Sequence, residues 1–145
     1  MVDPDIVASK LADLAHRIER VRENRRDTAE ALAADENALD VVSFNLMLAI
    51  QACADIASHL IADEGWPPPA NLAQSFSCLA QHGVLTDGTA KTLGRAVGLR
   101  NVVAHAYGRI NVTVVHGAAT SGLDDLQRFA AEVARWLATH GHPEA

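Results

Sequence analysis

Four polar side chains within eight residues have the types and the spacing needed for chemistry on a phosphate group. The stretch reads RNVVAHAY from Arg100 to Tyr107. Histidine titrates near neutral pH and can accept or release a proton, whereas arginine stays cationic and offers a fork of N–H donors that matches phosphate oxygens. Asn101, four residues before His105, lies near it on a helix and could fix the imidazole tautomer by a hydrogen bond. The spacing predicts an acid–base group beside a phosphate-binding cation.

The polar and apolar residues of this stretch separate when they are projected on a helix. With about 100° per residue, the apolar residues between Leu99 and Ala106 share an arc of roughly 100°, which we expect to face the core. Tyr107 falls about 20° from Arg100, and His105 falls about 140° from it. We therefore expect Arg100 and His105 to lie opposite the core and to flank one ligand. A solvated pair that binds nothing is the alternative.

Two glycines precede the motif on the His105 side of the same helix. Gly94 and Gly98 lie four residues apart, and each costs about 1 kcal/mol of helix stability relative to alanine. Such a cost suggests that another helix or a ligand approaches the backbone closely. We expect Gly94 and Gly98 to form a contact with a second copy of the chain.

The elements that must position this helix are themselves helical, because apolar residues recur at spacings of three and four throughout the chain. The first expected helix begins at Asp3-Pro4, the second spans about Asp35 to Glu64, and the third spans about Asn71 to Gln81. The fourth runs from Thr86 or Thr89 to Tyr107-Gly108, and the fifth begins at Ser121. Ile110, Val112 and Val114 alternate like a strand, but a single strand has no partner, so we expect a loop with a helical turn there. The sequence predicts an all-α antiparallel bundle of about five helices in one domain, residues 1–145, with a flexible tail over 139–145.

The charge of the chain is acidic overall but unevenly distributed. Its net charge is −6, which argues against general affinity for nucleic acid through phosphate neutralisation. Residues 10–26 nevertheless hold six basic and three acidic side chains, and residues 86–110 hold four basic and one acidic. These segments are either two solvated helix faces or, if the fold joins them, a site for a polyanion.

Other signals exclude several classes of protein. Cys53 and Cys78 lie within helical patterns and are expected to be reduced core residues. The seven histidines show no ligand spacing with one another or with the cysteines, so we expect neither a metal nor a cofactor. No apolar run is long enough to cross a membrane, and the N-terminus lacks the pattern of a signal peptide. We expect a cytoplasmic protein that does not bind membranes.

The stretch from Arg100 to Tyr107 resembles the R-x4-H-x-Y motif of the HepT-like branch of the HEPN superfamily. The similarity extends over Leu11 to Leu137 and includes the long amphipathic second helix and the Gly98-Leu99 sequence before the motif. It implies a HEPN-like homodimer that sets two motifs across one cleft, and an endoribonuclease that needs no metal. Arg100 and His105 would be catalytic and Asn101 supporting. Tyr107 would be adenylylated by a cognate minimal nucleotidyltransferase, the antitoxin that silences the toxin.

Three functions are compatible with these residues. The first is the toxin component of a type II toxin–antitoxin system, a metal-independent ribonuclease that cleaves an RNA substrate. The second is a non-catalytic helical module that binds a nucleotide or a nucleotidyltransferase through the same helix face. The third is a purely structural bundle, in which Tyr107 is a rim residue and the glycines of the fourth helix have no purpose. The first accounts for the most residues.

Overall fold

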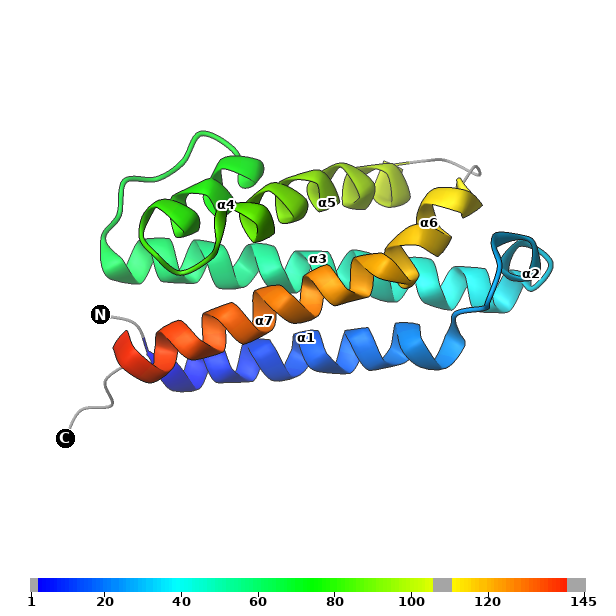
Figure 1. The fold of residues 1–145 in the computed structure, drawn as a ribbon, viewed down its shortest axis with the longest axis horizontal. Coiled ribbons are helices and arrows are strands. Elements are labelled where there is room, and N and C mark those ends of the chain that lie inside the picture. The colour runs from blue at the N-terminus through cyan, green and yellow to red at the C-terminus, as the bar shows by residue number, and fades with distance from the viewer. Residues whose placement is uncertain (1–2, 106–110, 141–145) are drawn as a thin grey trace.

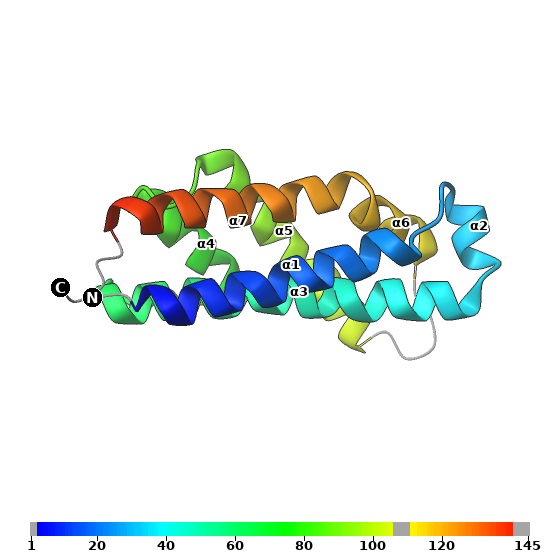
Figure 2. The same ribbon diagram turned by 90° about the horizontal axis from the view of Figure 1, so that it is seen from below.

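The computed structural model describes residues 3–105 and 111–140, and the side chains of residues 3–100 and 111–140. All regular secondary structure in these ranges is helical, in the order α1 (Pro4–Asn24), α2 (Ala29–Ala33), α3 (Glu36–Glu64), α4 (Leu72–Gln81), α5 (Asp87–His105), α6 (Val112–Ala119) and α7 (Ser121–His140). The long helices α1, α3 and α7 run the length of an elongated bundle, α4 and α5 cover one side, and α2 and α6 lie at one end (Figures 1 and 2). The predicted all-α antiparallel bundle is confirmed.

The five predicted helices correspond to α1, α3, α4, α5 and α7, and local capping explains their boundaries. Asp3 and Asp35 accept hydrogen bonds from backbone N–H groups of the first turns of α1 and α3, which satisfies donors that a helix start leaves unpaired. Gly65 ends α3 with a φ of 70°, a left-handed conformation that glycine adopts without strain. Three prolines follow from Pro67 and prevent the helix from continuing.

Two short helices complete the bundle beyond the five. Thr28 caps α2 through its side chain, which accepts from the N–H of Ala31. Asn111 caps α6 in the same way, so residues 112–119 form two helical turns where a loop with one turn was expected. At the other end of the chain, α7 continues through His140, so the first two residues assigned to the predicted tail are helical. The remainder, residues 141–145, lies outside the described residues.

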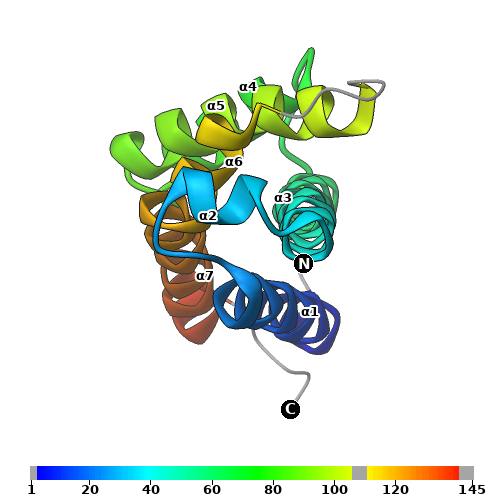
Figure 3. The same cartoon turned by 90° about the vertical axis from the view of Figure 1, so that its right-hand side faces the viewer.

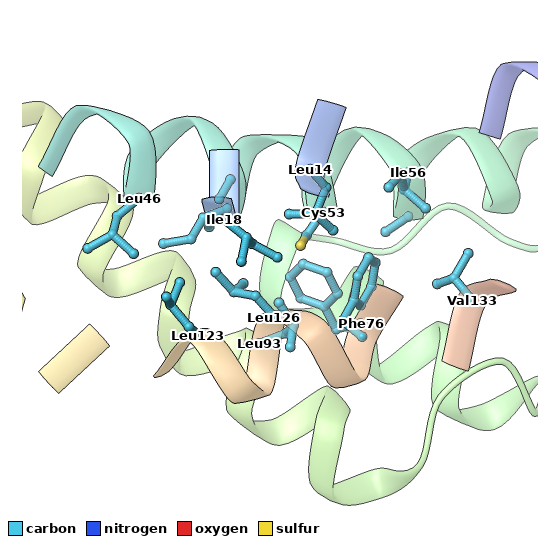
Figure 4. Close-up of a cluster of buried hydrophobic side chains, with 14 of the residues drawn as sticks. Leu14, Ile18, Leu46, Cys53, Ile56, Phe76, Leu93, Leu123, Leu126 and Val133 are labelled. Atoms are coloured by element: carbon cyan, nitrogen blue, oxygen red, sulfur yellow. The ribbon is translucent and has the colours of Figure 1, made fainter. Parts of the chain in front are cut away.

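The core runs along the bundle axis, with α3 at its centre. Side chains from five helices converge in Figure 4, among them Leu14, Ile18, Leu46, Ile56, Leu93, Leu123 and Val133. The rings of Phe76 and Phe129 meet edge to face at 5.9 Å, a favoured geometry for an aromatic pair. By length and composition α3 could cross a membrane, but more than half of its most apolar window is buried inside the bundle. Its hydrophobicity is that of a central helix.

Both cysteines belong to this core, as predicted. Cys53 and Cys78 are buried and free of disulfides. Burial disfavours the charged thiolate, and it raises the pKa of both thiols above the ordinary value. Neither thiol is suited to act as a nucleophile at neutral pH.

Candidate active site on helix α5

The helix that carries the motif is fixed at its start by a carboxylate from α7. Glu132 Oε1 accepts from the backbone N–H of Thr86 at 2.7 Å, and Glu132 Oε2 accepts from the Thr89 hydroxyl at 2.6 Å. Thr86 Oγ1 also accepts from the N–H of Thr89 at 3.2 Å. The first turn of α5 is thereby capped from two directions and tied to a second helix.

The side of α5 that faces the core is not the side predicted from the apolar residues between Leu99 and Ala106. Leu93 is fully buried and Val97 is half-buried, and Arg100 follows them by seven and three residues, which places it on the same side of the helix. Arg95 and Gly98 are exposed on the other side. The prediction that Arg100 lies opposite the core is therefore wrong.

The error has a physical cause. The predicted apolar arc covers only the last turns of the helix, beginning at Leu99. The buried side of α5 is set over its earlier turns, where Ala90 and Leu93 pack into the core. Leu99 is half-buried at the edge of this core, where it also lines a groove towards α6. Helix α5 packs against neighbours on more than one side, and the apolar residues of its last turns indicate only one of these sides.

The side chain of Arg100 is half-buried and reaches across to α3. Its Nη1 donates a hydrogen bond to Gln51 Oε1 at 3.0 Å. Gln51 in turn donates from Nε2 to Asp55 Oδ1 at 2.9 Å, one turn further along α3. The motif arginine is thus held by a chain of two hydrogen bonds that begins at a carboxylate on another helix.

The other motif residues follow Arg100 directly in the chain. Asn101 and His105 belong to the last turns of α5, and their side chains lie outside the described residues, as does Tyr107 altogether. Their catalytic, supporting and modification roles stay predictions.

The two glycines differ in their surroundings. A Cβ added to Gly94 would lie 3.8 Å from the Cβ of Ala73, so α4 of the same chain occupies that side of α5. Gly98 is exposed, and a Cβ added there would meet nothing within 4 Å. Gly98 is therefore open to an outside partner, whereas Gly94 is already covered by its own chain.

The described parts of the two basic segments are not joined. Helices α1 and α5 lie on opposite sides of the bundle, with α3 and α7 between them (Figures 1 and 3). The arginines of residues 10–26 are engaged within the chain. Arg17 donates to Asn45, Arg25 to the carbonyl of Ala119, and Arg26 to Asp35, while Arg20 and Arg22 pair with Glu23 and Glu19 on α1. The interpretation as a polyanion site shared by the two segments is not supported for residues 10–26.

Two features of the site had little or no signal in the sequence. Gln51 and Asp55 stand four apart on α3, but nothing in their spacing indicated Arg100 as a partner 49 residues away. On the other flank of α5, an apolar groove with a volume of about 240 Å³ opens towards α6 and α7. In the ranges that the structure describes, no three His, Cys, Asp or Glu side chains gather as a metal site would need.

Comparison with known proteins agrees with the fold. A family model described as ribonuclease HepT-like matches residues 14–133. Over 125 residues the chain is 30% identical to the mRNA nuclease HepT of Shewanella oneidensis, covering 86% of this chain and 93% of that protein. Over 119 residues it is 28% identical to a putative RNase of Archaeoglobus fulgidus, covering 82% and 89%. The chain belongs to the ribonuclease HepT-like family.

Solved structures give the same architecture. The tri-AMPylated HEPN toxin of Shewanella oneidensis, in complex with an MNT antitoxin, superposes with a TM-score of 0.82 and 29% identity. The match covers 90% of this chain and 98% of that one. The cytosolic protein YutE of Bacillus subtilis, of unknown function, superposes with a TM-score of 0.84 at 15% identity, a likeness of fold alone.

Proposed function

We propose that this protein is the toxin of a toxin–antitoxin pair and that it cleaves RNA without a metal ion. The observation that carries the proposal is the R-x4-H-x-Y motif, whose Arg100 and His105 belong to α5 and whose Arg100 is held by a side chain of α3, in a chain 30% identical to an mRNA nuclease. Its acidic charge confines RNA binding to a local site instead of a broad basic surface.

The reaction that these residues suit is attack of a 2′-hydroxyl on the adjacent phosphorus. The P–O5′ bond breaks, and the products are a 2′,3′-cyclic phosphate and a 5′-hydroxyl. His105 takes up or delivers the proton, Arg100 stabilises the charge that builds on the phosphoryl oxygens, and Asn101 orients the imidazole. One imidazole cannot take the proton from the 2′-oxygen and protonate the 5′-oxygen at once. A second copy of the chain, with its own motif across the cleft, supplies the other group.

Cleavage of single-stranded RNA by the purified chain in EDTA tests this chemistry. We expect His105→Ala to lower the rate at least about 100-fold while cleavage by the wild type persists in the chelator. His16→Ala is the matched control, because His16 is exposed on α1, on the other side of the bundle. An active His105→Ala variant removes His105 from catalysis. A wild type that binds RNA without cutting it supports the non-catalytic alternative.

The homodimer is best tested at Gly98. Because a Cβ there meets no described residue of its own chain within 4 Å, we expect Gly98→Leu to leave the protomer intact and to disturb only an outside contact. We expect it to weaken the dimer and to abolish cleavage. Gly88→Leu is the control, since Gly88 is also exposed on α5 without neighbours. A wild type that sediments as a monomer at micromolar concentration contradicts the assembly.

Tyr107 is the proposed site at which a minimal nucleotidyltransferase silences the protein. The similar toxin from Shewanella oneidensis is AMPylated and bound to such an antitoxin. Tyr107 stands seven residues after Arg100, so an AMP group on its hydroxyl would compete with RNA for the arginine. Intact-mass spectrometry after co-expression with the antitoxin should show added AMP on the wild type and none on Tyr107→Phe. A mass increase that persists in Tyr107→Phe assigns the modification elsewhere.

A further inference from the structure

We propose that Gln51 is a positioning residue for Arg100, and that Asp55 sets the orientation in which Gln51 acts. The inference rests on the proposed function in one respect, namely that Arg100 binds the phosphate of RNA. Neither Gln51 nor Asp55 belongs to the motif, and both lie on α3.

The side chains of Arg100 and Gln51 are in direct contact across two helices. Arg100 Nη1 and Gln51 Oε1 are 3.0 Å apart, and both side chains are half-buried between α5 and α3. An arginine side chain loses considerable rotamer freedom when it binds a phosphate. A side chain already held by an acceptor on the neighbouring helix has given up part of that freedom before RNA arrives, so phosphate binding costs less.

A second feature is the direction of the Gln51 amide. An amide offers an oxygen acceptor on one side and an NH₂ donor on the other, and it must turn the correct side to the arginine. The carboxylate of Asp55 only accepts, so the Gln51 NH₂ group faces Asp55 at 2.9 Å. The oxygen is then the atom left to face Arg100. Asp55 is exposed and contributes mainly this selection.

A third feature is charge. A carboxylate at position 51 would also hold the guanidinium, and more strongly, because both partners would be ionised. It would also bring a negative charge against the arginine, where it would repel an incoming phosphate. The amide supplies the geometry without that charge. The carboxylate that orients it lies one helical turn further along α3.

Two substitutions at position 51 separate geometry from charge. Gln51→Met keeps the length of the side chain but removes the acceptor, and we expect kcat/KM for RNA to fall about tenfold. Gln51→Glu keeps an acceptor and adds a charge. It should lower RNA affinity more than Gln51→Met does, and part of that loss should disappear as salt is raised. Asp55→Asn should cost about threefold, because an asparagine amide can accept or donate and no longer selects one orientation of Gln51.

Two controls test whether Gln51 affects cleavage only through Arg100. Gln127→Met changes an exposed glutamine on α7 and should leave cleavage as it is. In an Arg100→Ala background, Gln51→Met should have no further effect, because a residue that acts only through Arg100 has nothing left to position. Independent, multiplying effects of the two substitutions would overturn the proposal. So would a Gln51→Glu variant that binds RNA as well as the wild type.

A second readout separates this proposal from the proposed function. The same variants are titrated with a 2′-O-methyl RNA, which keeps the phosphates but lacks the attacking hydroxyl. If the wild type binds this RNA but does not cleave unmodified RNA of the same sequence, the ribonuclease assignment fails and Gln51 is judged by the affinities, with the same order expected. If the wild type does not bind RNA at all, both proposals fail.

Discussion

Arg25 and Arg26, which follow α1, and Arg100 on α5 illustrate two uses of the same side chain. Arg26 joins the ends of two helices through the carboxylate of Asp35 at 2.8 Å and also donates to backbone carbonyls. Arg25 donates to the carbonyl of Ala119 at the end of α6. Arg100 donates instead to a neutral amide on α3. A carboxylate partner compensates the charge of an arginine, whereas an amide partner fixes its position and adds no negative charge.

Basic composition alone did not distinguish these segments. Each has an excess of positive charge, and the one on α1 has more arginines. What separates Arg25 and Arg26 from Arg100 is the partner of each guanidinium, which is a carboxylate or a backbone carbonyl for the first two and an amide oxygen for Arg100. We expect Arg26 to contribute to stability and Arg100 to contribute to activity.

The largest effects should come from replacing one arginine of each kind with alanine and comparing the two variants in the same assays. Arg100→Ala should lower RNA cleavage at least about 100-fold, because it removes a charged group from the transition state, while the melting temperature falls by only a few degrees. Arg26→Ala should show the reverse, with kcat preserved and stability reduced. The measurements are initial rates and thermal unfolding of both variants.

Arg95→Ala completes this comparison, because Arg95 is exposed on α5 only five residues before Arg100. We expect it to keep cleavage within about twofold, the range of a surface charge. If Arg95→Ala lost as much activity as Arg100→Ala, general positive charge on α5 would explain the result and the special position of Arg100 would not.

A smaller effect should follow when the start of α5 is released from α7. Glu132→Ala removes the acceptor for the Thr86 N–H and the Thr89 hydroxyl, and we expect a loss of about 2 kcal/mol in the free energy of unfolding. Thr89 is almost fully buried, so its hydroxyl would lose its partner on α7. Glu132→Gln keeps an acceptor and should recover part of the loss. Urea unfolding of both variants measures it, and equal stability of Glu132→Ala and the wild type would remove α7 as the anchor of α5.

The sequence was sufficient to predict most of the fold. Asp3, Asp35 and Gly65 are local signals that act within one helical turn, so they located helix ends to within a residue. The short α2 was not predicted, because five residues are too few for an apolar period to show.

The site was predictable only in part. The motif identified Arg100 as a residue to examine, but its burial depends on Leu93 and Val97 earlier in α5 and on α3. Its partner Gln51 is 49 residues away in the chain. Contacts of this kind depend on how two helices pack, and no periodicity within either helix reports them.

The smallest expected effect concerns pH and the Arg26–Asp35 pair. The backbone N–H of Ala38, and then the Arg26 guanidinium, hold the pKa of the Asp35 carboxyl below its ordinary value of 3.8. Because folding lowers this pKa, the stabilisation is fully present above pH 3.8 and is lost as the pH falls through the folded-state value. Asp35→Asn keeps a good N-cap for α3 but loses the charge. The variant should therefore melt slightly below the wild type at about pH 7, and the gap should close as the pH falls through the folded-state pKa. Melting curves that stay the same distance apart at every pH would show that the charge of Asp35 contributes nothing, and that Arg26 stabilises the protein only through its bonds to backbone carbonyls.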